Sequence, residues 1–192
     1  MNQRDNLWII RPDSDSYATL KQKGRSENWI QKLNMLKAGG SLLESWEPVL
    51  LELYQDENRE QIQLPVPDFT MGVVTIAMSA TALELLQPLV YRSVEFLPLL
   101  TPFGPYYEMN VNLVDCLDVS NSIVKRYDHS GLVMGVQKYS FHWDKLNGVH
   151  IFLLPELGLS TFFVSNRFKQ EVKENNLTGL DFFPVPLLPQ QN

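Results

Sequence analysis

Apolar and polar positions along this chain follow two spacings. Short runs rich in β-branched and aromatic residues predict strands, and apolar residues three or four positions apart predict helices. One helical segment follows Ser26 and ends at Gly39 and Gly40. Further helices are expected at 79–89 and 165–173, and strands at 7–10, 49–54, 73–78, 94–97, 106–111, 123–127, 134–143, 149–154, 161–164 and 180–183. Asn147 and Gly148 predict a hairpin turn between two of these strands. The chain is therefore expected to form an α+β fold, with a mixed, mostly antiparallel sheet and a few short helices.

A strand–helix–strand pattern occurs twice, in residues 75–99 and 161–185, without gaps and offset by 86 positions. The identical positions are Thr75, Ser79, Phe96 and Pro98, which recur as Thr161, Ser165, Phe182 and Pro184. Each serine precedes a helix, and its hydroxyl can accept a hydrogen bond from the exposed backbone N–H groups of the first turn. Each proline is expected to end a strand, because it cannot donate to a sheet ladder. The pattern suggests two related halves, each crossing over to a parallel neighbouring strand. Shared patterning without a true repeat is the alternative.

The length of 192 residues favours one domain, which we expect to span residues 1–185. The uncharged residues 186–192 are expected to form a mobile tail. The single cysteine, Cys116, excludes an intrachain disulfide and is expected to be buried as a small apolar residue. No run of about 18 apolar residues predicts a membrane span. The first residues lack the apolar core of a signal peptide, so a cytoplasmic location is expected.

The net charge of −6 is unevenly distributed. Residues 41–122 hold twelve acidic and two basic side chains, whereas 1–40 and 123–192 are slightly basic. An acidic domain repels phosphates, which argues against nucleic-acid binding. It attracts a basic protein partner and accelerates the encounter. The alternative is a solvated acidic face that only aids solubility.

Few residues offer catalytic chemistry. His142 and Asp144 flank Trp143 and would share one face if this segment were a strand, but no metal-binding motif has the required spacing. We therefore expect no metal and no cofactor. Asp115 and Asp118 could form a carboxylate pair of the kind that hydrolyses sugars, with an ordinary acidic loop as the alternative.

A series of short motifs from Asp68 onward, kept in order, resembles a known family. These motifs are Asp68-Phe69, Met78-Ser79, Val94–Leu99, Tyr107–Val111, Cys116–Asp118, His150–Phe152, Phe163–Ser165 and Leu177–Phe182. Together they resemble immunity-protein family eleven of bacterial polymorphic toxin systems. The resemblance covers roughly residues 46–185, and residues 1–45 are less clearly matched.

The resemblance implies a cytoplasmic protein that binds a cognate toxin and neutralises it by stoichiometric contact, with no catalytic residue and no oligomeric state implied. We expect the contact to use acidic residues of exposed loops, with an aromatic anchor. The candidates are Glu44, Glu47, Asp56, Glu57 and Glu60, with Tyr54 as the anchor. The acidic excess further suggests that the toxin is basic. The alternatives are a small-molecule or scaffold-binding α+β module and a hydrolase that uses Asp115, Asp118 or His142.

Overall fold

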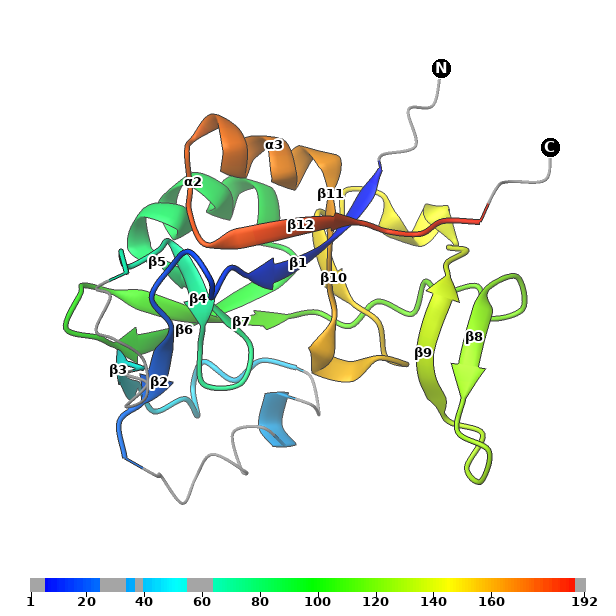
Figure 1. Ribbon diagram of the computed structural model, residues 1–192, viewed down its shortest axis with the longest axis horizontal. Coiled ribbons are helices and arrows are strands. Elements are labelled where there is room, and N and C mark those ends of the chain that lie inside the picture. The colour runs from blue at the N-terminus through cyan, green and yellow to red at the C-terminus, as the bar shows by residue number, and fades with distance from the viewer. Residues whose placement is uncertain (1–5, 25–33, 37–39, 55–63, 189–192) are drawn as a thin grey trace.

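The structure, a computed structural model, describes residues 6–24, 34–36, 40–54 and 64–188. The strands form a four-stranded sheet in the order β10-β11-β1-β12, a six-stranded sheet in the order β2-β3-β6-β7-β5-β4 and a two-stranded ribbon of β8 and β9 (Figure 1). The first sheet contains β1 (Leu7–Pro12), β10 (Ile151–Leu153), β11 (Phe162–Ser165) and β12 (Leu180–Pro184). The second contains β2 (Leu20–Gln22), β3 (Val49–Leu53), β4 (Phe69–Met71), β5 (Ile76–Ser79), β6 (Val94–Leu100) and β7 (Tyr106–Val111). The ribbon contains β8 (Ile123–Arg126) and β9 (Val133–Lys138), and the helices are α2 (Ala80–Val90) and α3 (Asn166–Glu174). The predicted α+β class is confirmed.

The two sheets contain the same arrangement of four strands. In the second sheet, β7 lies between β5 and β6 and is antiparallel to both, with β4 outside β5. In the first sheet, β1 lies between β11 and β12 and is antiparallel to both, with β10 outside β11. The two strand–helix–strand units are therefore confirmed. The expected crossover to an adjacent parallel strand is wrong, because a strand from another part of the chain lies between the two parallel strands in each unit.

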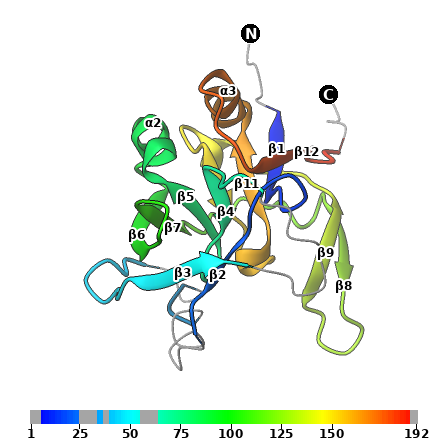
Figure 2. The same cartoon turned by 60° about the vertical axis from the view of Figure 1, so that its left-hand side comes forward.

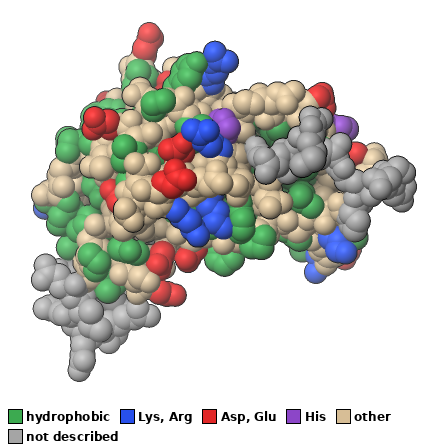
Figure 3. All heavy atoms as spheres, turned by 90° about the horizontal axis from the view of Figure 1, so that it is seen from above, with side chains coloured by type: hydrophobic (Ala, Val, Ile, Leu, Met, Phe, Trp, Pro, Cys, Tyr) green, Lys and Arg blue, Asp and Glu red, His purple; other side chains and the backbone are tan. Residues whose placement is uncertain are grey.

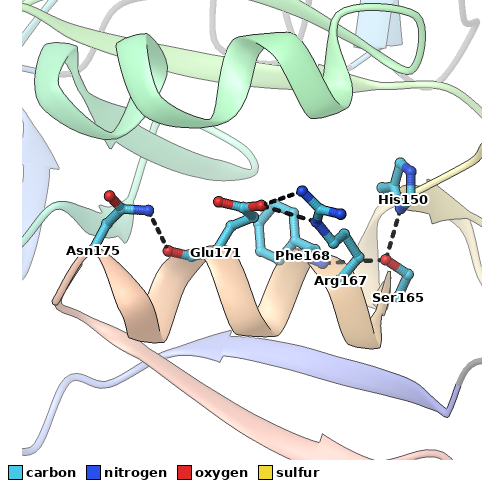
Figure 4. A network of polar contacts seen from close by, with 6 residues as sticks. All are labelled: His150, Ser165, Arg167, Phe168, Glu171 and Asn175. Atoms are coloured by element: carbon cyan, nitrogen blue, oxygen red, sulfur yellow. Dashed lines mark hydrogen bonds and ion pairs between the residues drawn. The ribbon is translucent and has the colours of Figure 1, made fainter.

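The serine at the start of each helix is held in the same way. The Ser79 hydroxyl accepts from a backbone N–H in the first turn of α2 (3.1 Å), and the Ser165 hydroxyl accepts from one in α3 (3.2 Å). Ser79 also donates to the Asp68 carboxylate (2.8 Å), while Ser165 hydrogen-bonds to Nδ1 of His150 (2.9 Å; Figure 4). Asp68 and His150 each immediately precede the edge strand that pairs with the first strand of their unit: β4 follows Asp68, and β10 follows His150. The sequence repeat thus corresponds to a repeated capping arrangement.

The expectation that proline ends the second strand of each unit is confirmed for Pro184 and wrong for Pro98. β6 continues through Pro98 to Leu100, and β12 includes Pro184 as its last residue. Pro98 pairs with β7 on one side, while on the other side β3 begins to pair only at Leu99. At that position the indole of Trp46 donates to the Pro98 carbonyl (2.8 Å). A proline is tolerated there because no neighbouring strand requires its N–H.

The predicted Asn147-Gly148 hairpin is also wrong. Residues Trp143–Leu146 form a 3₁₀ helix, and β9 pairs with β8 rather than with β10. The strand expected at 134–143 accordingly ends at Lys138. The short strand β4 is an element that the sequence pattern did not predict.

A shared core joins the two sheets. It takes side chains from β1, β4, β5, β6, β7, β10 and β11, and both helices pack against it. The helices α2 and α3 lie side by side over the same face of the molecule (Figure 1). A second cluster lies under β2, β3 and β6, and a third lies on the other face of β1, β10 and β11. Cys116 is fully buried in the third cluster, as predicted.

Candidate functional site

Several acidic residues of the segment 41–122 face inward rather than toward solvent. Glu108 is fully buried on β7. Its carboxylate accepts from the backbone N–H groups of Val73 (2.7 Å), Val74 (2.8 Å) and Thr75 (2.5 Å), and from the Thr75 hydroxyl (2.9 Å). Gly72 leaves room for this carboxylate, since a Cβ there would overlap it. Glu108 therefore stabilises the turn between β4 and β5, and part of the acidic excess serves the fold.

Glu95 fixes the loop that leads into β3. Its carboxylate accepts from the Ser41 hydroxyl (2.5 Å), from the backbone N–H of Leu42 (2.7 Å) and Leu43 (3.2 Å), and from the Asn110 amide (3.0 Å). Burial acts to raise the pKa of Glu95, but these hydrogen bonds outweigh it and hold the pKa below its usual value. We call residues 41–48 the clamped loop. Its path is fixed before any partner arrives.

Six residues of the clamped loop are exposed: Ser41, Leu43, Glu44, Ser45, Glu47 and Pro48. The loop is held from below by Trp46, which is buried and donates to β6. The predicted contact residues Glu44 and Glu47 thus lie on the outer side of a well-anchored loop. Such a loop presents its side chains with little further loss of conformational entropy on binding.

The clamped loop continues into β3, whose outer side is partly apolar. Alternation along the strand places Leu50, Glu52 and Tyr54 on one side. Leu50 lies in register with Leu100 of β6, and the two side chains are 43% and 54% exposed. Lys21 of β2 lies 3.9 Å from the Glu52 carboxylate and 5.6 Å from the ring centroid of Tyr54.

We define the β3 surface by these side chains together with Lys23. Its members are Lys21, Lys23, Leu50, Glu52, Tyr54 and Leu100. A shallow depression of about 280 Å³ is lined by Lys23, Leu50, Leu51, Glu52, Leu100, Thr101 and Pro102. Its volume falls just below the range of about 300–1,000 Å³ that is typical of small-molecule clefts. Exposed aliphatic side chains beside an aromatic and a few charges are instead typical of a protein contact.

The sequence-based candidates fall into two groups. Glu44, Glu47 and Tyr54 lie on the clamped loop and the β3 surface, and Tyr54 is 57% exposed. Asp56, Glu57 and Glu60 lie outside the described residues. Sequence reasoning missed Leu50 and Leu100. The alternation in 49–54 could have identified Leu50, whereas the exposure of Leu100 depends on its register with β3.

The two carboxylates considered for hydrolysis each contact a different partner. Asp115 lies at the surface, 3.4 Å from the ammonium of Lys145. Asp118 accepts from the side chain of Asn121 (2.7 Å), and this bond, with a contribution from nearby His142, lowers the pKa of Asp118. A general acid needs a raised pKa, because it must hold its proton near neutral pH.

The expectation that His142 and Asp144 share a strand face is wrong, because Trp143 begins a 3₁₀ helix that contains Asp144. Both side chains are exposed. Across residues 6–24, 34–36, 40–54 and 64–188, no three His, Cys, Asp or Glu side chains gather in a way that could hold a metal ion.

The face formed by the two helices has a different character. Seen from that side, acidic and basic side chains are interspersed with apolar ones (Figure 3). On α3, for example, Arg167 pairs with Glu171 one turn later (2.8 Å), and Asn175 donates to the Glu171 carbonyl (2.8 Å; Figure 4). These contacts are local to the helix and stabilise it.

Fold and surface together define an α+β protein with two similarly arranged sheets and an exposed, partly apolar strand face. Residues 41–186 match the model of the Immunity protein family (Imm11), and the chain belongs to this family. The matched region begins at the clamped loop and includes all of β3. No curated protein matches the sequence. The described helices are all too short or too polar to cross a membrane.

Proposed function

We propose that this protein binds a cognate toxin in the cytoplasm and neutralises it by stoichiometric contact, without turnover of a substrate. The observation that carries this proposal is the match of residues 41–186 to an immunity-protein family. The site geometry supports it, because the carboxylates Asp115 and Asp118 are engaged by surface partners rather than poised in a cleft.

The contact surface that we propose is the clamped loop together with the β3 surface. Tyr54 would be the aromatic anchor, since tyrosine is enriched among the residues that dominate binding energies. Leu50 and Leu100 supply adjacent apolar area that a partner would desolvate. Glu44 and Glu47, with Asp56, Glu57 and Glu60 in the segment that follows β3, would face basic residues of the toxin.

The rigid loop gives this contact a physical mechanism. Glu95 and Trp46 hold the clamped loop against β6, so little ordering is required on binding. A preformed, partly apolar surface that covers the toxin's active site would exclude the toxin's substrate. Neutralisation then requires only a slow dissociation rate.

A binding experiment with a matched aromatic control tests the proposal. The purified chain is titrated with the toxin encoded by the neighbouring gene, and the affinity is measured by calorimetry. Tyr54→Ala is expected to weaken binding about tenfold to a hundredfold. Tyr91→Ala is the control, because Tyr91 is equally exposed at 57% but lies at the end of α2. Absence of a complex with the unaltered chain would refute the function. Equal effects of the two substitutions would refute the assigned surface.

A further inference from the structure

The ribbon of β8 and β9 is a sheet of its own. Its strands pair with each other and, within the described part of the chain, with no other strand. It projects at the end of the molecule away from β2 and β3, clear of the helices (Figures 1 and 2). β8 therefore has an unpaired edge, with backbone N–H and C=O groups available for another strand.

The side chains of the ribbon are unusually exposed for their type. Ile123, Tyr127, Leu132 and Met134 are each at least 44% exposed, and all lie within residues 123–138. The side chain that attaches the ribbon to the core is Val136, which packs on the third cluster. A two-stranded ribbon with so little buried area is only marginally stable in water. A partner that covered these side chains would stabilise it.

The charge of the ribbon is opposite to that of the whole chain. The two strands carry Lys125, Arg126 and Lys138 and no acidic residue, although the net charge of the protein is −6. The Arg126 guanidinium donates to the Gly131 carbonyl (2.8 Å) and helps to hold the turn. Lys125 and Lys138 are exposed.

The basic side chains of β8 favour some partners over others at its free edge. Lysines on an edge strand discourage pairing with a second copy. Two β8 strands paired with each other would bring Lys125 and Arg126 of both copies into one short sheet with no acidic side chain between them, and the repulsion of like charges disfavours that pair. A strand that carries Asp or Glu would instead be attracted.

We propose that β8 accepts an extended acidic segment of the toxin polypeptide as a third strand of the ribbon. The proposal rests on the function proposed above and adds a second contact of opposite charge. Main-chain hydrogen bonds along the β8 edge would supply the affinity. Specificity would come from acidic side chains near Lys125 and from apolar ones that cover Ile123.

Two measurements on the complex with the neighbouring-gene toxin test this inference. Amide hydrogen exchange in residues 123–126 should slow at least about tenfold on binding, because strand addition engages the free β8 edge. The variant Lys125→Glu should bind about tenfold more weakly, since the complementary pair between Lys125 and the acidic strand becomes repulsive. Lys173→Glu on α3 is the matched control, because Lys173 is also an exposed lysine. Thermal unfolding of each variant checks that the fold is intact.

Strand addition requires both results. Slower exchange without an effect of the lysine reversal would overturn the acidic occupant. Weaker binding without slower exchange would overturn strand pairing, because long-range attraction would then explain it. A complex that shows neither effect overturns the ribbon contact and leaves the proposed function standing. If the unaltered chain forms no complex, the proposed function fails as well.

Discussion

At the scale of single residues, the main finding is that carboxylates serve as internal acceptors in this fold. Glu108 accepts four hydrogen bonds in a fully buried position, and Glu95 accepts four at the clamped loop. Asp68 accepts from Ser79 and from both the N–H and the hydroxyl of Thr178 (2.9 Å each). A net charge counted from sequence treats all such groups as surface charge. In this protein the surface is less acidic than that count implies.

Replacing the buried carboxylate should be costly. Glu108→Gln would place an NH₂ group against backbone N–H donors in the β4–β5 turn, leaving donors without acceptors. We expect the free energy of unfolding, measured in urea, to fall by about 2–4 kcal/mol. Glu84→Gln, on the exposed side of α2, is the control and should change it by less than about 0.5 kcal/mol. Equal effects of the two substitutions would contradict the assigned role of Glu108.

The Glu95 clamp predicts a pH dependence of stability. Because the folded-state pKa of Glu95 is lowered from 4.5, its contribution is fully present above that value and is lost as the pH falls through the folded-state pKa. In urea, the free energy of unfolding of the unaltered protein should therefore exceed that of Glu95→Gln at pH 7. This difference should become smaller at about pH 3. A difference that stays constant with pH would show that the hydrogen bonds of the clamped loop do not depend on the ionisation of Glu95.

At the scale of elements, local signals predicted the local structure. The predicted bounds of α2 and α3 were correct to within one residue. These helices were located from the helical spacing of apolar residues and from the serine that precedes each helix and caps its first turn. The predictions failed where pairing with segments distant in sequence determines the structure. Pro98 lies inside β6 because β3 starts to pair one residue later, and the partners of β9 and β10 lie on strands that the Asn147-Gly148 turn signal does not identify.

The candidate site shows the same division. Glu44, Glu47 and Tyr54 were predicted as contact residues from residue type and position, and all three are exposed. Leu100 could not be identified, because its partner Leu50 is 50 positions away and only the register of β3 on β6 brings them together. Sequence therefore located one segment of the surface, and tertiary pairing completed it.

The two serine caps should make comparable contributions to stability. Ser79→Ala and Ser165→Ala each remove a hydroxyl that accepts from the first turn of a helix, so each should cost about 1 kcal/mol. The free energy of unfolding measures this, with Ser120→Ala at an exposed position as the control. If only one of the two substitutions lowered the free energy of unfolding, the two caps would share their geometry but not their contribution to stability.

At the scale of the whole molecule, the two similar halves are not independent. The shared core contains buried residues from both sheets, including Phe69 and Met78 from one and Phe162 and Val164 from the other. The Asp68–Thr178 hydrogen bonds and the backbone bond from Phe69 N–H to the Thr178 carbonyl (3.0 Å) also cross between them.

We infer that residues 7–185 unfold as one cooperative domain. Scanning calorimetry should show a single transition in which the calorimetric and van't Hoff enthalpies agree, because neither sheet can lose the shared core alone. Far-ultraviolet and tryptophan signals should change at the same temperature. Two separated transitions would show that the halves are separate folding units.

The position of β1 has a consequence for synthesis. β1 lies between β11 and β12, which are made at least 150 residues later. On the ribosome, Leu7 and Ile10 therefore emerge well before the strands that bury them. The nascent chain must keep these apolar residues from aggregating until β11 and β12 have been made. A product that stopped before β11 would leave β1 without a neighbouring strand on either side.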